Sequence, residues 1–178
     1  GLDPRVIRQS ALEELIAHQP ERIAAMKQIV MIQCVRPEGA PDYCSRTCCT
    51  NSLKNAIRIK MLNPNCAVTI LYKDIITYGF REKFYSEARR RGVLFVRYTD
   101  NDRPAVEIQN SKFQTSNGGL PSAICHQPSA ITVRVHEHIF GETLELTPDL
   151  VALSMSIAPG EDSAALAGAM RLPLSTEG

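Results

Sequence analysis

Continuous apolar runs alternate with segments of helical periodicity along the first hundred residues. The apolar runs cover residues 29–32, 67–72 and 93–98. Runs of this length between polar turns are typical of strands that are buried on both faces of a sheet. The segments between them, at about 45–62 and 79–91, carry apolar residues at helical spacing. This β-α-β-α-β order with short connections predicts a parallel sheet with right-handed crossovers.

Two further features of the helices can be predicted from caps and apolar spacing. Asp3 and Pro4 have the order of an N-cap and a first-turn proline, so a helix is expected over about residues 4–18. The helix that begins near Ser45 should turn one face toward the core. That face is expected to carry Leu53, Ala56, Ile57 and Met61.

The pattern changes after residue 99. Antiparallel strands are predicted at 105–109, 131–136 and 143–146, the last after a turn at Gly141. A buried strand at 150–155 and a short helix at about 162–170 follow. Residues 110–129 form a polar insertion rich in Ser, Gly and Pro, which is expected to be flexible.

The predicted fold class is therefore α/β. We expect a Rossmann-like, three-layer parallel sheet with an antiparallel β extension, in one domain over residues 1–178. The expected parts are a leading helix and linker (1–28), a parallel core (29–99), the insertion (110–129), and an antiparallel extension with a closing strand and helix (130–178).

Composition excludes several classes of partner. The 178 residues are 44% apolar, and 20 basic and 19 acidic side chains are interspersed to give a net charge of +1. This balance argues against a nucleic-acid-binding stripe. No apolar run approaches the roughly 20 residues that span a bilayer. We expect a cytoplasmic protein without a membrane span.

Four of the six cysteines lie within sixteen residues, in the pattern C-x9-C-x3-C-C formed by Cys34, Cys44, Cys48 and Cys49. Cys34 ends a predicted parallel strand, at the edge where open α/β sheets usually bind ligands. The other three occupy the loop and first turn of the next helix, whose N–H groups and dipole favour thiolates. Cys44 and Cys48 are four residues apart and can share a helix face, while Cys49 points elsewhere. The separated corners of a cubane [4Fe–4S] cluster suit this spread.

Other interpretations of the cysteines remain open. A single zinc ion needs all four thiolates to converge, and it usually comes with two C-x2-C pairs, which are absent here. The cysteines could also be core thiols or a redox dithiol. Cys66 and Cys125 stand apart and are expected to be ordinary buried thiols.

Several residues outside the cysteine motif are weaker candidates. Asp74 follows the second parallel strand, where a ribose-binding carboxylate or, more commonly, a turn residue or helix cap would lie. Lys73 and Arg46 could offset cluster charge or simply be solvated. Tyr78 could shield the cluster, although a packing role is the commoner one. A zinc site formed by His136, His138, Cys125 and His126 is conceivable, although exposed strand histidines are commoner.

The sequence resembles a known family over nearly its whole length. The segments that carry the resemblance are IQCVRPEGAPDYCSRTCCTNSLKNAIRIK, VTILYKDIITYGFREKFYSEARRRGVLFVRY and ITVRVHEHIFGETLELTPDLVALSMSIAP. They are similar to the A subunit of CoB–CoM heterodisulfide reductase and its bacterial relatives. In that family the protein is a cytoplasmic iron–sulfur flavoprotein with FAD and several [4Fe–4S] clusters, similar in fold to thioredoxin reductase.

The resemblance implies an internal fragment of a larger flavoprotein, corresponding to the NAD(P)H-binding domain of thioredoxin-reductase-like proteins. It implies that Cys34, Cys44, Cys48 and Cys49 hold a [4Fe–4S] cluster in an electron-transfer module. The isolated module would not be catalytic and would not bind the FAD of the longer protein. The implied partners are other subunits of a heterodisulfide-reductase-like complex and ferredoxin or hydrogenase-type electron donors.

The sequence departs from the pattern of a dinucleotide-binding domain at two places. The first strand–helix turn carries the cysteines instead of G-x-G-x-x-G, and Ser156 stands where flavoprotein reductases tend to have Gly. Val35-Arg36-Pro37 also replaces the family's Gly-Ser-Arg type of sequence. The missing glycine loop and Ser156 argue against nicotinamide binding. Two alternative functions remain: a nicotinamide-dependent disulfide reductase that uses a dithiol, and a zinc-stapled interaction domain.

Overall fold

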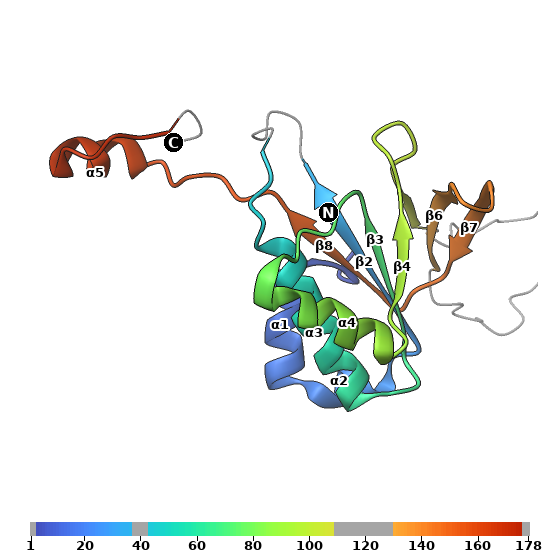
Figure 1. The fold of residues 1–178 in the computed structure, drawn as a ribbon. Helices are drawn as coiled ribbons and strands as arrows, with labels where there is room; N and C mark the ends of the chain where they lie inside the picture. The colour runs from blue at the N-terminus through green and yellow to red at the C-terminus, as the bar shows by residue number, and fades with distance from the viewer. Residues whose placement is uncertain (1–2, 37–42, 109–129, 176–178) are drawn as a thin grey trace, which may run out of the picture.

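A five-stranded parallel sheet forms the centre of the protein (Figure 1). The computed structural model describes residues 3–36, 43–108 and 130–175. The strands of this sheet follow the order β1-β8-β2-β3-β4. They are β1 (Val6–Arg8), β2 (Gln28–Val35), β3 (Ala67–Tyr72), β4 (Leu94–Arg97) and β8 (Leu150–Met155). The parallel strands predicted from the apolar runs are confirmed.

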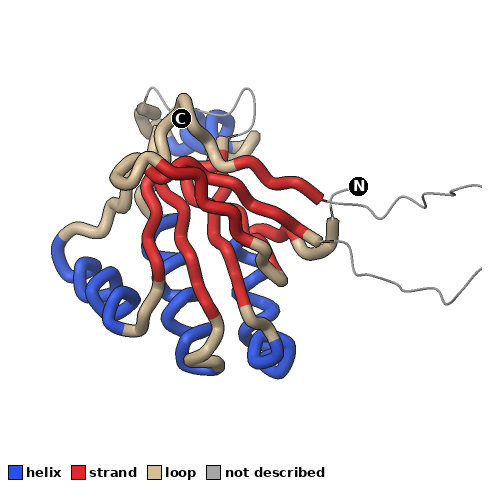
Figure 2. Tube along the Cα trace, turned by 90° about the vertical axis from the view of Figure 1, so that its right-hand side faces the viewer, coloured by secondary structure: helices blue, strands red, loops and turns tan. Residues whose placement is uncertain are grey.

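Helices cover one face of this sheet and a second sheet covers the other (Figures 1 and 2). The helices on the first face are α1 (Gln9–His18), α2 (Pro20–Ala25), α3 (Cys48–Leu62) and α4 (Glu82–Arg90), the last preceded by a 3-10 turn η1 (Gly79–Arg81). The antiparallel sheet consists of β5 (Ala105–Ile108), β6 (Ile131–Glu137) and β7 (Glu142–Leu146) in the order β5-β6-β7. The predicted three-layer α/β fold with an antiparallel extension is confirmed.

Each face of the parallel sheet has its own apolar core. Leu53, Ile59 and Leu12 are fully buried between the helices and the sheet, against Met31 and Ile70. On the other face, residues of β2, β3 and β8 pack against the antiparallel sheet. This second core contains Val30, Ile32, Leu71, Val151, Ile131, Val133 and Val135. Alternate residues of β2 therefore belong to different cores, as expected for a strand buried on both faces.

The beginning of the chain differs from the prediction of a helix over residues 4–18. Val6, Ile7 and Arg8 form β1, which pairs in parallel with Val151, Ala152 and Leu153. Asp3 is not a helix cap, because its carboxylate binds the backbone N–H and guanidinium of Arg5. The pairing of β1 with the distant strand β8 therefore determines the structure here, in place of the helix that Asp3 and Pro4 predicted. The helix begins only at Gln9, and Pro20 opens the separate helix α2.

Two predictions for α3 are also wrong. The helix begins at Cys48 and not near Ser45, so Cys44 lies outside it and cannot share a helix face with Cys48. Met61 is 53% exposed, while Ile59 and Asn55 are buried in its place, together with the predicted Leu53 and Ala56. The buried face of the helix is thus rotated from the one expected.

The last part of the chain returns to the parallel sheet before leaving it. β8 lies between β1 and β2, and Ser154 and Met155 end it at the same edge as Cys34. The helix α5 (Ser163–Met170) confirms the short helix predicted there, and it lies apart from the helical layer, beyond an extended segment (Figure 1). The insertion predicted at 110–129 falls outside the described residues.

None of the helices within the described ranges has the length and apolar character of a membrane-spanning segment. The cytoplasmic location stays a prediction.

Candidate iron–sulfur site

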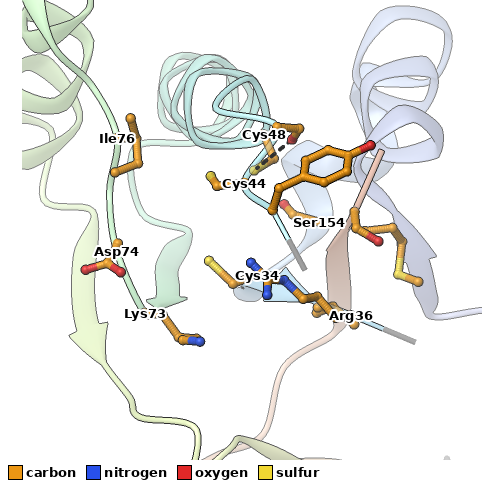
Figure 3. Close-up of a pocket in the computed structure, with 13 residues that line it drawn as sticks. Cys34, Arg36, Cys44, Cys48, Lys73, Asp74, Ile76 and Ser154 are labelled. Carbon is orange, nitrogen blue, oxygen red and sulfur yellow. Dashed lines mark hydrogen bonds between the residues drawn. The ribbon is translucent and has the colours of Figure 1, made fainter. Parts of the chain in front are cut away.

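The carboxyl ends of β2, β3 and β8 surround a pocket of about 100 Å³ (Figure 3). Cys34 contributes to it from the end of β2, Cys44 from the loop, and Cys48 from the first turn of α3. Lys73, Asp74 and Ile76 line it from the segment after β3, and Ser154, Met155 and Ser156 from the end of β8. Three of the four predicted ligands therefore meet at the predicted edge of the sheet.

Cys34 has an unusual backbone conformation. Its φ is +57°, in the left-handed region that favours glycine. The register between β2 and β8 shifts between Ile32 and Val35, so Cys34 sits in an irregularity of the strand. The preceding carbonyl, that of Gln33, accepts a hydrogen bond from the hydroxyl of Tyr98 at 2.5 Å. Strain of this kind persists only where surrounding contacts fix it, and it is common at functional sites.

Cys44 is the most accessible of the four cysteines. It is exposed, and its Sγ accepts a hydrogen bond from the backbone N–H of Arg46 at 3.4 Å. Arg46 also has a left-handed φ of +58°. The turn before α3 thus directs a backbone N–H at this sulfur.

Cys48 and Cys49 interact with each other. The pKa of Cys48 is lowered to about 6, chiefly by a hydrogen bond from Cys49. Burial raises it, but hydrogen bonds from Ser45 and from the backbone N–H groups of both cysteines lower it further. The contact between the two thiols raises the pKa of Cys49, and burial raises it further. Ser45 Oγ lies 3.9 Å from Cys48 Sγ. The predicted effect of a helix N-terminus on thiolates thus acts on Cys48.

Cys49 is the buried member of the pair and faces the segment after β3. Its Sγ accepts a hydrogen bond from the backbone N–H of Ile76 at 3.5 Å and lies 3.7 Å from the carbonyl oxygen of Asp74. Cys48 lines the pocket, whereas Cys49 does not line it but contacts Cys48. The fourth predicted ligand is therefore a neighbour of the pocket wall and not part of it.

Charged groups on the β3 side of the pocket pair with one another. Lys73 Nζ binds Asp100 Oδ2 at 2.5 Å, and Asp74 Oδ1 lies 3.5 Å from Arg97 Nη2. Asp74 does not cap the next helix, whose N-cap position is Tyr78. Tyr78 is 63% exposed, so the prediction that it packs is wrong. The helical segment begins at Gly79, as predicted, and Asp74 lies too far before it in the chain to cap it.

A buried polar cluster lies beneath the pocket, and sequence patterns did not indicate it. Gln33 Nε2 donates to Ser52 Oγ, and Ser52 Oγ lies 3.1 Å from Ser154 Oγ. All three residues are buried. The one signal in the sequence was the spacing of Ser52, one helical turn after Cys48, which places a hydroxyl on the same side of α3.

The donor set fits a cluster better than a single ion. No three His, Cys, Asp or Glu side chains within the described residues come close enough to hold one metal ion. A cubane binds each thiolate at a different iron, so its ligands need not converge on one point. The first turn of α3 has no acidic side chain that would repel an anionic group. The three thiols that line this pocket, with Cys49 in contact with Cys48, therefore suit an iron–sulfur cluster better than a single ion.

The remaining candidates do not form a second site in the described part of the chain. His136 and His138 stack edge to face with ring centroids 4.8 Å apart, and His138 Nε2 lies 3.7 Å from Asp102. Cys125 and His126, the other members of the conceivable zinc site, lie outside the described residues. Cys66 is fully buried, as predicted.

Comparison with known proteins identifies relatives of the chain. No family model matches it. It is 33% identical over 157 residues to the A subunit of the ferredoxin:CoB–CoM heterodisulfide reductase of Methanosarcina acetivorans, covering 85% of the chain and 17% of that protein. It is 36% identical over 168 residues to the A subunit of the H(2)/formate:CoB–CoM heterodisulfide, ferredoxin reductase of Methanococcus maripaludis, covering 90% of the chain and 22% of that protein.

The chain thus spans about a fifth of the length of the curated relatives that it matches. Among solved structures, L-lysine 6-monooxygenase from Pseudomonas syringae superposes with a TM-score of 0.51 at 10% identity, over 99% of this chain and 46% of that one. This likeness supports the α/β fold alone. In sequence, the chain resembles one segment of the A subunits of heterodisulfide reductases, as its cysteine motif predicted.

Proposed function

We propose that the chain is an electron-transfer module in which Cys34, Cys44, Cys48 and Cys49 hold a [4Fe–4S] cluster. The observation that supports the proposal is that three of these cysteines line one pocket, and that Cys49 contacts Cys48. Such a cluster, when bound, stores and passes single electrons at a potential set by its surroundings. The module itself would make and break no substrate bonds.

Each part of the pocket wall has a role in this proposal. Cys34 is held by the central strand β2, and Cys48 and Cys49 by the first turn of α3, where free N–H groups favour thiolates. Ile76 and Met155 are apolar lining residues that limit the access of water. Lys73 contributes a cation to the lining on the β3 side, and it is paired with Asp100.

Nicotinamide binding is not part of the proposal. A dinucleotide site needs a glycine loop that lets the pyrophosphate approach the backbone and a helix N-terminus. At the corresponding turn this chain has Cys34, a side chain in a left-handed conformation where glycine would be unstrained. The cysteine loop thus stands in place of a phosphate loop.

The relatives suggest the setting of the module. Their names describe subunits of heterodisulfide reductases that use ferredoxin, hydrogen or formate. We therefore propose that the module relays electrons to and from the FAD of a longer protein, within a complex of similar subunits. Ferredoxin or hydrogenase-type proteins are the proposed donors.

Metal analysis of anaerobically prepared protein tests the proposal. We expect about four iron and about four acid-labile sulfide per chain, and a paramagnetic signal after one-electron reduction. Serine substitution of Cys34 or Cys48 should remove most of the bound iron. Cys66→Ser is the matched control, since this buried thiol lies at the other end of β3 and should leave the iron content unchanged.

The other outcomes are equally informative. Zinc without sulfide would contradict the proposal and favour a zinc-stapled interaction domain. Metal-free protein that oxidises NADH while reducing a disulfide would instead favour a dithiol reductase. Equal loss of iron in the Cys66→Ser control would show that the metal is held non-specifically.

A further inference from the structure

The buried polar cluster beneath the pocket links three elements that each carry part of the cysteine site. Gln33 precedes Cys34 on β2, Ser52 follows Cys48 by one turn on α3, and Ser154 lies near the end of β8. Their relative exposures are 1%, 1% and 3%. Ser154 nevertheless lines the pocket together with Cys34 and Cys48 (Figure 3). It is therefore a buried hydroxyl on the wall of the proposed cluster site.

The hydrogen atoms of this cluster can be assigned from its contacts. Gln33 Nε2 donates to Ser52 Oγ, so Ser52 acts as an acceptor there. A serine hydroxyl has one hydrogen, and the other contact of Ser52 Oγ in the described part of the protein is Ser154 Oγ at 3.1 Å. Ser52 therefore donates to Ser154. The hydrogen of Ser154 is then left for an acceptor on the pocket side.

We infer that the Ser154 hydroxyl donates a hydrogen bond into the cysteine pocket and raises the reduction potential of a cluster held there. This inference deepens the proposed function and rests on it. Hydrogen bonds to the sulfur atoms of a cluster and its ligands stabilise the more negative, reduced state, which makes reduction easier. The chain Gln33 to Ser52 to Ser154 fixes the direction of that donor, because each hydroxyl already accepts one bond.

Ser156 provides a matched control on the same strand end. It also lines the pocket, but it is only partly buried. Its backbone N–H binds the carbonyl of Val35, and no side-chain hydrogen bond of Ser156 is found among the described residues. A substitution of Ser156 changes the polarity of the pocket without touching the buried chain of donors.

The test is a redox titration of the cluster-loaded protein, followed by electron paramagnetic resonance. Ser154→Ala should make reduction less favourable by roughly tenfold in the equilibrium constant, about 59 mV for a one-electron couple. Ser156→Ala should shift the potential much less. Iron and sulfide contents and the melting temperature are measured for each variant, because a merely structural role would lower those quantities and leave the potential unchanged.

A second pair of variants keeps the test decisive if Ser154→Ala does not fold. Ser154→Thr and Ser154→Val have nearly the same shape, and only the first has a hydroxyl. The threonine variant should show the higher potential. Equal potentials in this pair, or equal shifts in the two alanine variants, would overturn the inference and leave the proposed function standing. A wild-type protein that binds no iron and sulfide would overturn both.

Discussion

The two ends of the parallel sheet are built in different ways. At the amino ends of the strands, polar side chains form hydrogen bonds with backbone groups. Asp149 Oδ2 accepts hydrogen bonds from the N–H groups of Lys27 and Gln28 at 2.6 and 2.9 Å. Asn63 Nδ2 donates to the carbonyls of Ala24 and Met26 at 3.0 and 2.9 Å. At this end, side chains of connecting segments thus bind backbone groups of the neighbouring elements.

The carboxyl ends show strain and unpaired groups instead. Cys34 and Arg46 have left-handed backbones there, and the buried atoms Gln33 Oε1 and Gln9 Nε2 have no hydrogen-bond partner in the described part of the protein. Left-handed residues other than glycine cost about 1–2 kcal/mol each. The difference indicates that the amino ends stabilise the fold and that the carboxyl ends have kept costly features for a site.

The largest effect on stability should come from removing the Asp149 hydrogen bonds at the amino ends of the strands. Asp149→Ala removes a charged acceptor from two backbone N–H groups, and we expect the unfolding free energy to fall by about 2 kcal/mol. Chemical denaturation measures this change. Asp149→Asn keeps one acceptor oxygen and should lose less; an equal loss would show that the hydrogen bonds are not the cause.

The next effect concerns the reactivity of the adjacent thiols in metal-free protein. Because the pKa of Cys48 is lowered to about 6 and that of Cys49 is raised, Cys48 is a thiolate above about pH 6 while Cys49 stays protonated. Iodoacetamide at pH 7 should label Cys48 at least roughly tenfold faster than Cys49. Mass spectrometry of the labelled peptide at several pH values gives both rates. Similar rates at pH 7 would contradict the assignment.

A smaller effect on stability, this time a gain, is expected from relieving the backbone strain at Cys34. Cys34→Gly in metal-free protein should be more stable than Cys34→Ala by about 1 kcal/mol, because glycine adopts the left-handed conformation without strain. Thermal unfolding of the two variants measures the difference. Val35→Gly, at a neighbouring strand position, is the control and should be destabilising. A glycine variant that is the less stable of the two would show that Cys34 is unstrained.

The smallest effect should follow the loss of an exposed ion pair at the pocket rim. Asp74 and Arg97 are about two-thirds exposed, and their charged atoms lie 3.5 Å apart. Asp74→Ala should therefore change the unfolding free energy by less than about 0.5 kcal/mol. Denaturation at low and high salt measures it. A loss as large as that of Asp149→Ala would remove the contrast between the two ends.

The sequence allowed the parallel core and the place of the cysteines to be predicted, because both depend on local patterns. The apolar run before Cys34 indicates a strand buried on both faces, and a ligand at its carboxyl end follows from the parallel topology. The order of strands beyond β2, β3 and β4 was not predictable in this way. Three residues, Val6 to Arg8, are too few to show a period, and their partner is β8 at the other end of the chain.

Within the site, the position of the thiols could be predicted, but the loop geometry and the buried hydroxyls around them could not. The loop before α3 continues to Thr47, since the left-handed Arg46 interrupts helical geometry, and this separates Cys44 from the helix. The hydroxyls of Ser52 and Ser154 meet across 102 residues of sequence, so spacing alone could not pair them. Whether the four thiols bind a cluster stays a prediction.

The position of β2 has a consequence for the speed of electron transfer. Hydrogen-bonded neighbours lie along both edges of the strand, and apolar cores lie on both of its faces. Cys34 follows the doubly paired part of β2 by two residues, so its thiol is attached close to one of the most closely packed parts of the protein. A redox centre anchored there would rearrange little when its charge changes, and little driving force would be lost to nuclear motion.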